Sequence, residues 1–238
     1  MGTKIIKIES QEVQDFLGRT GDSNKLHQAP TNLLPGMFYL NLASGALLKP
    51  IRQLEIAFKN PTIYPCSVEM WDENYSGERK ILFSDSGKQL CDITAKLGES
   101  KECSGNPNLD KIRLICSIPG ELVKKLGEGV YIKQQIRFLI DNLQDARLEI
   151  QERGGRSGIK RVGTNYVKNG KIVAEGSAIV GSKEMLKETL ANLSKTGCCY
   201  VGGLENQEGT REHNSYCRGD EKTERLELNV EVFYQKHC

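Results

Sequence analysis

The segment from Glu152 to Gly176 has the most uneven charge in the sequence, so it is the first candidate for chemistry. It reads ERGGRSGIKRVGTNYVKNGKIVAEG and contains no acidic side chain between Arg153 and Ala174. Glycines let a main chain approach phosphates closely, and nearby cations and a stacking ring could complete a groove for a single strand. The alternative is a solvated loop without a partner. The predicted clamp for single-stranded nucleic acid consists of Arg153, Arg156, Lys160, Arg161, Tyr166, Lys168 and Lys171.

Cysteine and histidine residues near the C-terminal end form a second candidate, a metal site. Cys199, His213 and Cys217 have a spacing at which sulfur and nitrogen donors could converge on tetrahedral zinc. No cofactor other than this zinc is predicted. Since the sequence has no secretory signal, the eight cysteines are otherwise expected to be free thiols. A fourth ligand could come from Cys198, His237 or Cys238.

Catalytic patterns are otherwise sparse. Asp141, Asp145 and Glu149 could hold Mg²⁺ beside a nuclease-like strand, although solvated acids on a turn explain them equally well. The chain has only three histidines, and no glycine-rich phosphate loop precedes a helix. The sequence therefore favours a non-enzymatic protein and leaves the question of an enzyme open.

Composition limits the remaining classes. The chain has 33 Lys and Arg against 31 Asp and Glu, so any attraction to a polyanion must come from local clusters. It has no apolar run long enough to span a membrane and no secretory signal, which predicts a cytoplasmic protein without a membrane partner. A chain of 238 residues can bury one large core or two small ones.

Alternating apolar and polar residues predict that strands dominate the fold. Asn169-Gly170 between two such runs predicts a two-residue hairpin turn. Helices are expected over residues 10–19, capped by Ser10, over residues 120–129 and over residues 182–197. The expected strands cover residues 4–10, two short stretches within 37–48, and residues 51–58, 62–73, 110–120, 130–138, 146–153, 163–181 and 225–235.

This order of elements predicts an α+β protein dominated by strands. The expected architecture is a curved antiparallel sheet or a partly open barrel like an oligonucleotide-binding fold, with two or three short helices. Residues 1–238 are expected to form one domain. The glycine-rich turn at 154–163 could divide it into a strand-rich body, 1–153, and a part with a hairpin, a helix and a closing strand, 164–238. The sequence shows no internal repeat.

Five stretches follow one another within residues 19–140, in the order GDSNKLHQAPTNLLPGMFYLNLASG, IRQLEIAF, IYPCSVEMWDEN, SDSGKQLC and DKIRLICSIPGELV. In this order residues 19–140 resemble phage-encoded proteins of the single-stranded-DNA-binding and recombination type. This resemblance implies an oligonucleotide-binding barrel that acts in phage replication or recombination. The cysteine pairs often seen in that group are not reproduced here.

A second, shorter resemblance agrees on the ligand but not on the fold. The stretch GGRSGIKRVG is similar to the glycine-rich loop of RNA-binding repeat-associated proteins of CRISPR effector complexes, which also implies a phosphate-backbone ligand. The competing class is a structural or assembly protein of the virion type, in which polar arms at 18–36 and 202–224 grip neighbouring subunits. The sequence analysis therefore predicts a nucleic-acid-binding protein, with a homo-oligomer left open and a structural protein as the alternative.

Overall fold

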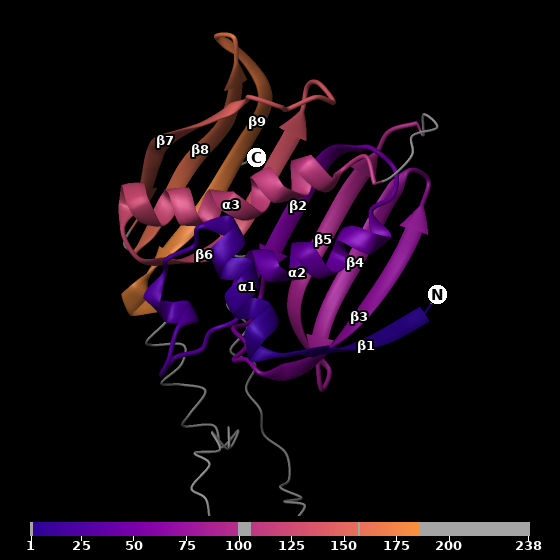
Figure 1. Ribbon diagram of the computed structural model, residues 1–238, viewed down its shortest axis with the longest axis vertical. Coiled ribbons are helices and arrows are strands. Elements are labelled where there is room, and N and C mark those ends of the chain that lie inside the picture. Colours follow the sequence, from indigo (N-terminus) through magenta and orange to yellow (C-terminus); the bar gives the residue numbers. More distant parts are fainter. Residues whose placement is uncertain (1, 100–105, 157, 186–238) are drawn as a thin grey trace, which may run out of the picture. The chain divides into compact units, whose positions relative to one another are not determined.

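Nine antiparallel strands form one sheet in the computed structural model, which describes residues 2–99, 106–156 and 158–185. The sheet is curved, and its order is β1-β3-β4-β5-β2-β6-β9-β8-β7 (Figure 1). The strands are β1 (Gly2–Ile8), β2 (Ile51–Phe58), β3 (Cys66–Tyr75), β4 (Glu78–Asp85), β5 (Lys88–Leu97), β6 (Gly129–Phe138), β7 (Arg147–Arg156), β8 (Ile159–Lys168) and β9 (Lys171–Ser182).

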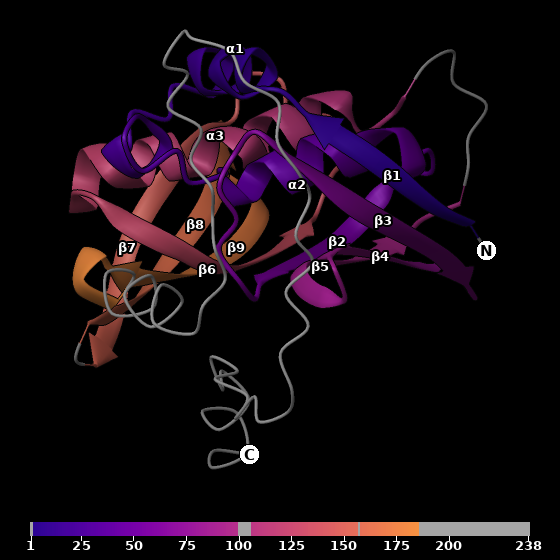
Figure 2. The same ribbon diagram turned by 90° about the horizontal axis from the view of Figure 1, so that it is seen from below.

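The helices of the described residues cover one face of this sheet, with α1 farther from the strands than α2 and α3 (Figure 2). Buried apolar side chains fill the space between the two layers, so this face of the sheet holds the core. None of these helices combines the length and the apolar character needed to cross a bilayer. The helices are α1 (Ser10–Thr20), α2 (Gly36–Ala43) and α3 (Leu109–Leu126), with the short 3-10 turns η1 (Lys25–His27) and η2 (Ser44–Ala46).

The strand order reveals a repeat that the sequence analysis missed. In the first half the helical segment is followed by β2 to β5, in the spatial order β3-β4-β5-β2. In the second half α3 is followed by β6 to β9, in the corresponding order β7-β8-β9-β6. The hairpin turns also correspond, because Ser86-Gly87 and Asn169-Gly170 both have positive φ at both positions. The repeat is one of element order and turn geometry, and the sequence itself shows none.

The two halves meet along the centre of the sheet. There β2 pairs with β6, and Glu55 lies opposite Gln135. Above this pair α2 contacts α3, and the Cys116 thiol donates a hydrogen bond to the Met37 carbonyl oxygen at 3.6 Å. The halves therefore share one continuous sheet and one core, so a site at their junction can take residues from both.

Most of the predicted strands are confirmed, as is the helix over residues 10–19, although Glu9 rather than Ser10 occupies its N-cap position. Two segments were predicted wrongly. The segment 37–48 forms α2 and η2 instead of two strands, because Met37, Phe38, Tyr39 and Leu40 are all buried and leave no polar face to give a helical period. The expected strand 110–120 is the first part of α3.

The predicted fold class is confirmed at its coarser level, an α+β protein on a curved antiparallel sheet. The oligonucleotide-binding type of barrel is not confirmed. In the described residues β1 and β7 are the two edges of the sheet and do not pair with each other. The predicted closing strand at 225–235, and nearly all of the predicted helix at 182–197, lie outside the described residues.

Candidate active site

The residues of the predicted nucleic-acid clamp lie on β7, β8 and β9. The side chains of Arg153, Arg156, Lys160 and Arg161 are exposed, but Lys160 forms an ion pair with Glu152 at 3.6 Å. Tyr166 is only 1% exposed, and its hydroxyl donates to the Leu114 carbonyl oxygen in α3 at 2.6 Å. Its ring belongs to the core and cannot stack on a base. Lys168 and Lys171 face each other across the Asn169-Gly170 turn.

The predicted zinc ligands Cys199, His213 and Cys217 lie outside the described residues, so zinc stays a prediction. Within the described ranges no three His, Cys, Asp or Glu side chains gather closely enough to hold a metal ion. Asp141, considered above as a magnesium ligand, instead contacts Lys111 and Arg52, each at 3.0 Å.

The environment of the cysteines in the described part of the chain makes them poor nucleophiles. Cys66, Cys91 and Cys116 are free thiols. Burial raises the pKa of Cys66 to about 11 and that of Cys116 to about 12. Because the thiolate is the nucleophile, these groups contribute packing rather than reactivity.

The most unusual polar group is a buried pair, Asp22 and His27, in the loop between α1 and α2. The His27 Nε2 atom lies 3.5 Å from the Asp22 Oδ2 atom, and their side chains are 10% and 3% exposed. Buried ionisable side chains are rare unless they are paired. This loop therefore places a carboxylate and an imidazole face to face in a nearly dry environment.

The proton arrangement of His27 follows from its partners. Its Nδ1 atom lies 2.8 Å from the Leu33 carbonyl oxygen, which can only accept a hydrogen bond, so Nδ1 carries the proton. The Nε2 atom that faces Asp22 then carries the lone pair when the ring is neutral. Burial lowers the pKa of His27, although the Asp22 charge and the Leu33 hydrogen bond oppose this shift. At neutral pH the ring is therefore a base whose free nitrogen points at a carboxylate.

Asn24 holds this loop in shape. Its backbone N–H donates to Asp22 Oδ1 at 3.1 Å, and its side-chain oxygen accepts from the Leu26 N–H at 3.2 Å. Its side-chain nitrogen donates to the Gly129 carbonyl oxygen at 2.8 Å. Gly129 begins β6, so Asn24 connects the acid–base pair of the first half to the central strand of the second half.

Other residues of the second half contribute to the environment of the Asp22–His27 pair. Tyr131 on β6 has a pKa raised well above its usual range, mainly by burial and further by the charge of Asp22. Its hydroxyl therefore stays protonated and donates to Gln134 Oε1 at 2.6 Å. Gly120 in α3 lets the helix approach the loop, since a Cβ atom there would lie 2.6 Å from the Gly21 carbonyl oxygen. The pair thus lies at the junction of the two halves.

The loop is also fixed from the first half. The Tyr64 hydroxyl donates to the His27 carbonyl oxygen and accepts from Gln14 Nε2 at 2.8 Å. Gln14 also lines a surface cavity of about 720 Å³ against α1 and α2, which does not include Asp22 or His27. Two hydrogen bonds therefore join this cavity to the histidine loop.

Sequence reasoning missed Asp22 and His27 because both occur in a polar, turn-rich stretch that was interpreted as a loop or mobile arm. The available signal was weak: an acid, an asparagine and a histidine within six residues, GDSNKLH, in a chain with only three histidines. Neither periodicity nor charge distinguishes such a loop from a solvated one. The burial of Asp22 and His27, which makes the pair chemically unusual, is seen only in the folded structure.

No family model and no curated protein sequence matches the chain. Solved structures do match in shape. A tesB protein from Mycobacterium avium subs paratuberculosis has 10% identity and a TM-score of 0.52, over 71% of this chain and 98% of that one. The 12:0-ACP thioesterase from Umbellularia californica has 11% identity and a TM-score of 0.53, over 76% of this chain and 94% of that one. A MaoC-like dehydratase has 8% identity and a TM-score of 0.54, over 76% of this chain and 98% of that one.

These likenesses correct the resemblance to phage single-stranded-DNA-binding proteins, which was wrong. Two of the stretches that carried it form the Asp22–His27 loop with α2 and most of α3, and the other three lie in β2, β3 and the β4–β5 hairpin of the nine-stranded sheet. The predictions of a nucleic-acid-binding protein and of a single-stranded nucleic-acid partner are overturned with it, since the matching structures are a tesB protein, a 12:0-ACP thioesterase and a MaoC-like dehydratase. The alternative of a structural virion-type protein gains no support from them either. The sheet, curved around its helices, is consistent with the hot-dog fold.

Proposed function

We propose that the chain is an enzyme that acts on acyl thioesters and adds or removes water next to the thioester carbonyl. The observation that carries this proposal is the buried Asp22–His27 pair at the junction of the two halves. The shape likeness to thioesterases and to a MaoC-like dehydratase supports the substrate class and the reaction class. Asp22 and His27 would be the catalytic residues.

The chemistry fits the substrate because a thioester carbonyl acidifies the neighbouring carbon C2 and activates C3 of a 2-enoyl chain. In hydration, the neutral Nε2 of His27 takes a proton from water as the water oxygen bonds to C3. The Asp22 carboxylate orients that water and stabilises the imidazolium that forms. The imidazolium then returns the proton to C2, so that H and OH have added across the double bond. Dehydration follows the same steps in reverse.

Hydrolysis of the thioester is the second candidate, and the likeness to the tesB protein and the 12:0-ACP thioesterase favours it. The same pair could direct water at the carbonyl carbon instead of C3. The two reactions leave different products: hydrolysis releases a free thiol, whereas hydration keeps the thioester and removes the conjugated double bond.

One substrate series distinguishes them. Purified protein is mixed with trans-2-enoyl thioesters of coenzyme A, of short and medium chain length, and two signals are followed together. Loss of enoyl absorbance without thiol release supports hydration, and release of thiol supports hydrolysis. If neither signal changes over the background for any chain length, the proposed function is wrong.

Two variants test whether Asp22 and His27 are the catalytic residues. Asp22→Asn and His27→Gln keep the size of each side chain and should each reduce turnover about 10² to 10⁴-fold, the usual contribution of a general acid or base. Asp110→Asn is the matched control, because Asp110 is a highly exposed acid in the first turn of α3. Turnover of this control should stay within about twofold of the parent.

A further inference from the structure

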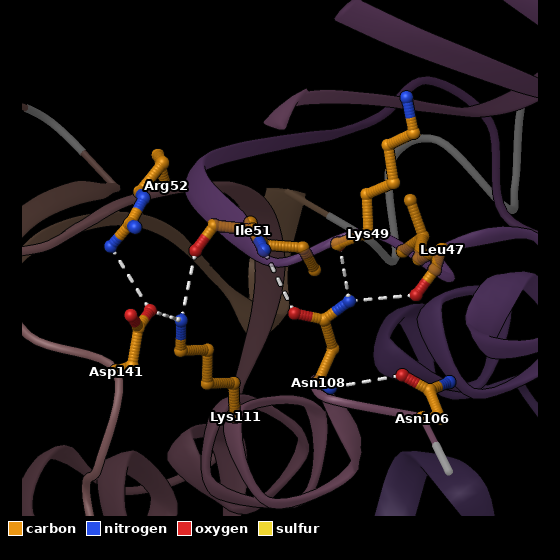
Figure 3. A network of polar contacts seen from close by, with 8 residues as sticks. All are labelled: Leu47, Lys49, Ile51, Arg52, Asn106, Asn108, Lys111 and Asp141. Atoms are coloured by element: carbon orange, nitrogen blue, oxygen red, sulfur yellow. Dashed lines mark hydrogen bonds and ion pairs between the residues drawn. The ribbon is translucent and has the colours of Figure 1, made fainter. Parts of the chain in front are cut away.

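A second polar cluster lies at the other end of the junction, around Asn108 (Figure 3). Asn108 is fully buried and immediately precedes α3. Its backbone N–H donates to Asn106 Oδ1 at 2.9 Å, and its side-chain nitrogen donates to the Leu47 and Lys49 carbonyl oxygens, each at 2.7 Å. Its side-chain oxygen accepts from the Ile51 N–H at 2.8 Å.

These contacts repeat those of Asn24 in the other half. Each asparagine N–H donates to the side-chain oxygen of the residue two positions earlier, Asp22 in one loop and Asn106 in the other. Each asparagine side chain also donates to a main-chain carbonyl at the start of the other half's central strand or within two residues before it. That carbonyl belongs to Gly129 for Asn24 and to Lys49 for Asn108. Since β2 and β6 are themselves counterparts in the repeat, the two asparagines occupy corresponding places.

The third residue after each asparagine is also comparable. His27 follows Asn24 and lies between the Leu33 carbonyl oxygen and the Asp22 carboxylate. Lys111 follows Asn108 and lies between the Ile51 carbonyl oxygen and the Asp141 carboxylate, each 3.0 Å from its Nζ atom. Both side chains are nearly buried, and both contact one main-chain oxygen and one acid.

We infer that Asn106–Lys111 is the structural counterpart of the Asp22–His27 loop, changed from an acid–base site into a latch that holds the two halves together. Asn106 stands where the acid would be and has no proton to exchange. Lys111 stands where the imidazole would be. Within the residues that the structure describes, the repeat then holds one acid–base site, not two. The description of the first loop as catalytic rests on the proposed function, whereas the latch does not.

The physical setting of Lys111 suits a latch. Its side chain is 2% exposed, so its ammonium group needs fixed partners, and it has the Ile51 oxygen, Asp141 and the face of the Phe138 ring at 4.8 Å. Asp141 follows β6, and Ile51 begins β2, so the lysine connects both central strands to α3. Lys111 lowers the pKa of Asp141, which keeps that carboxylate charged opposite it.

Four variants separate a latch from an acid–base loop. Asn108→Ala and Lys111→Met should lower the Tm by about 6 °C or more, because each leaves buried polar groups unpaired. Their turnover per folded molecule should stay within about twofold of the parent. Asn24→Ala and His27→Gln should instead lose turnover at least about tenfold. If Asn108→Ala and Lys111→Met leave the Tm unchanged, or lose turnover as strongly as the first-loop variants do, the inference is wrong.

Stoichiometry gives an independent readout. A non-hydrolysable thioether analogue of an acyl-coenzyme A, titrated calorimetrically into the full chain, should saturate at one equivalent per chain, and also in Lys111→Met. Saturation at two equivalents would overturn the inference that one site remains. Failure of the proposed function is recognisable separately, because the parent would then show neither binding nor turnover while the Tm values of Asn108→Ala and Lys111→Met would still test the latch.

Discussion

Gly120 lies where α3 touches the loop that carries Asp22, so Gly120→Ala tests how closely that contact controls the site. A Cβ atom at this position would lie 2.6 Å from the Gly21 carbonyl oxygen and 2.8 Å from its carbonyl carbon. Ordinary contact begins at 3.4 Å, so helix and loop must separate by the difference, about 0.8 Å. Both obstructing atoms belong to the main chain, and no side-chain rotation can relieve the contact.

The expected effect falls mainly on catalysis. A displacement near 1 Å can cost about 10²-fold in rate, so turnover should fall about 10 to 100-fold. Overpacking costs about 1–3 kcal/mol of folding free energy, and alanine recovers about 1 kcal/mol as the better helix former. A net loss of up to about 2 kcal/mol corresponds to a fall in Tm of up to about 8 °C.

Gly18→Ala is the matched control. Gly18 is also in a helix, α1, but a Cβ atom there meets nothing within 4 Å. That variant should gain up to about 1 kcal/mol and keep its turnover. Both variants are measured by thermal unfolding and by the enoyl-thioester assay. If Gly120→Ala behaves like Gly18→Ala in both measurements, the contact does not position the acid–base loop.

Protonation of His27 should affect the pH dependence of both activity and stability. Its folded-state pKa lies below the ordinary value of 6.5, so kcat/KM should decline only below pH 6.5, and a decline that begins above 6.5 would contradict the burial argument. In that same window the unfolded chain binds more protons than the folded chain, so Tm should fall as pH drops below 6.5, and less so in His27→Gln. Tyr64→Phe removes the hydrogen bond to the His27 carbonyl oxygen and should lower both turnover, by a few fold, and Tm, by about 2–4 °C. Tyr39→Phe, whose hydroxyl donates to Thr62 instead, should lower Tm without lowering turnover; equal turnover losses in both tyrosine variants would refute a specific role for Tyr64.

The strands other than β4 and β5 were the predictable part of this fold. Half-buried strands show alternation in the sequence, and the two-residue turn at Asn169-Gly170 needs positive φ, which asparagine and glycine supply. The central helices were not predictable in the same way. α2 is buried on nearly all sides, and α3 contains Pro119, a residue that ordinarily argues against a helix interior.

The site was harder to predict than the fold, because its chemistry depends on burial. The arginines of residues 153–161 stand out in the sequence, yet they lie on exposed strands. Asp22 and His27 look like ordinary loop residues until the contact of α3 and the carbonyl of Gly129 enclose them. The repeat was hidden for a related reason, since its two loops share Asn24 and Asn108 but differ at the acid and the base.

Among the described residues β7 lies at the edge of the sheet, and this position gives the positive charges near residue 153 a physical role. An edge strand presents unpaired main-chain groups that can pair with another chain, and charged side chains discourage this. β7 carries Arg147, Arg153 and Arg156, and the opposite edge, β1, carries Lys4 and Lys7. β7 also carries Glu149 and Glu152, but cations outnumber acids on both strands, so two copies that approach through either edge would meet net positive charge. The charge that first drew attention in the sequence would then act against β-aggregation, and it should protect less well as salt screens it.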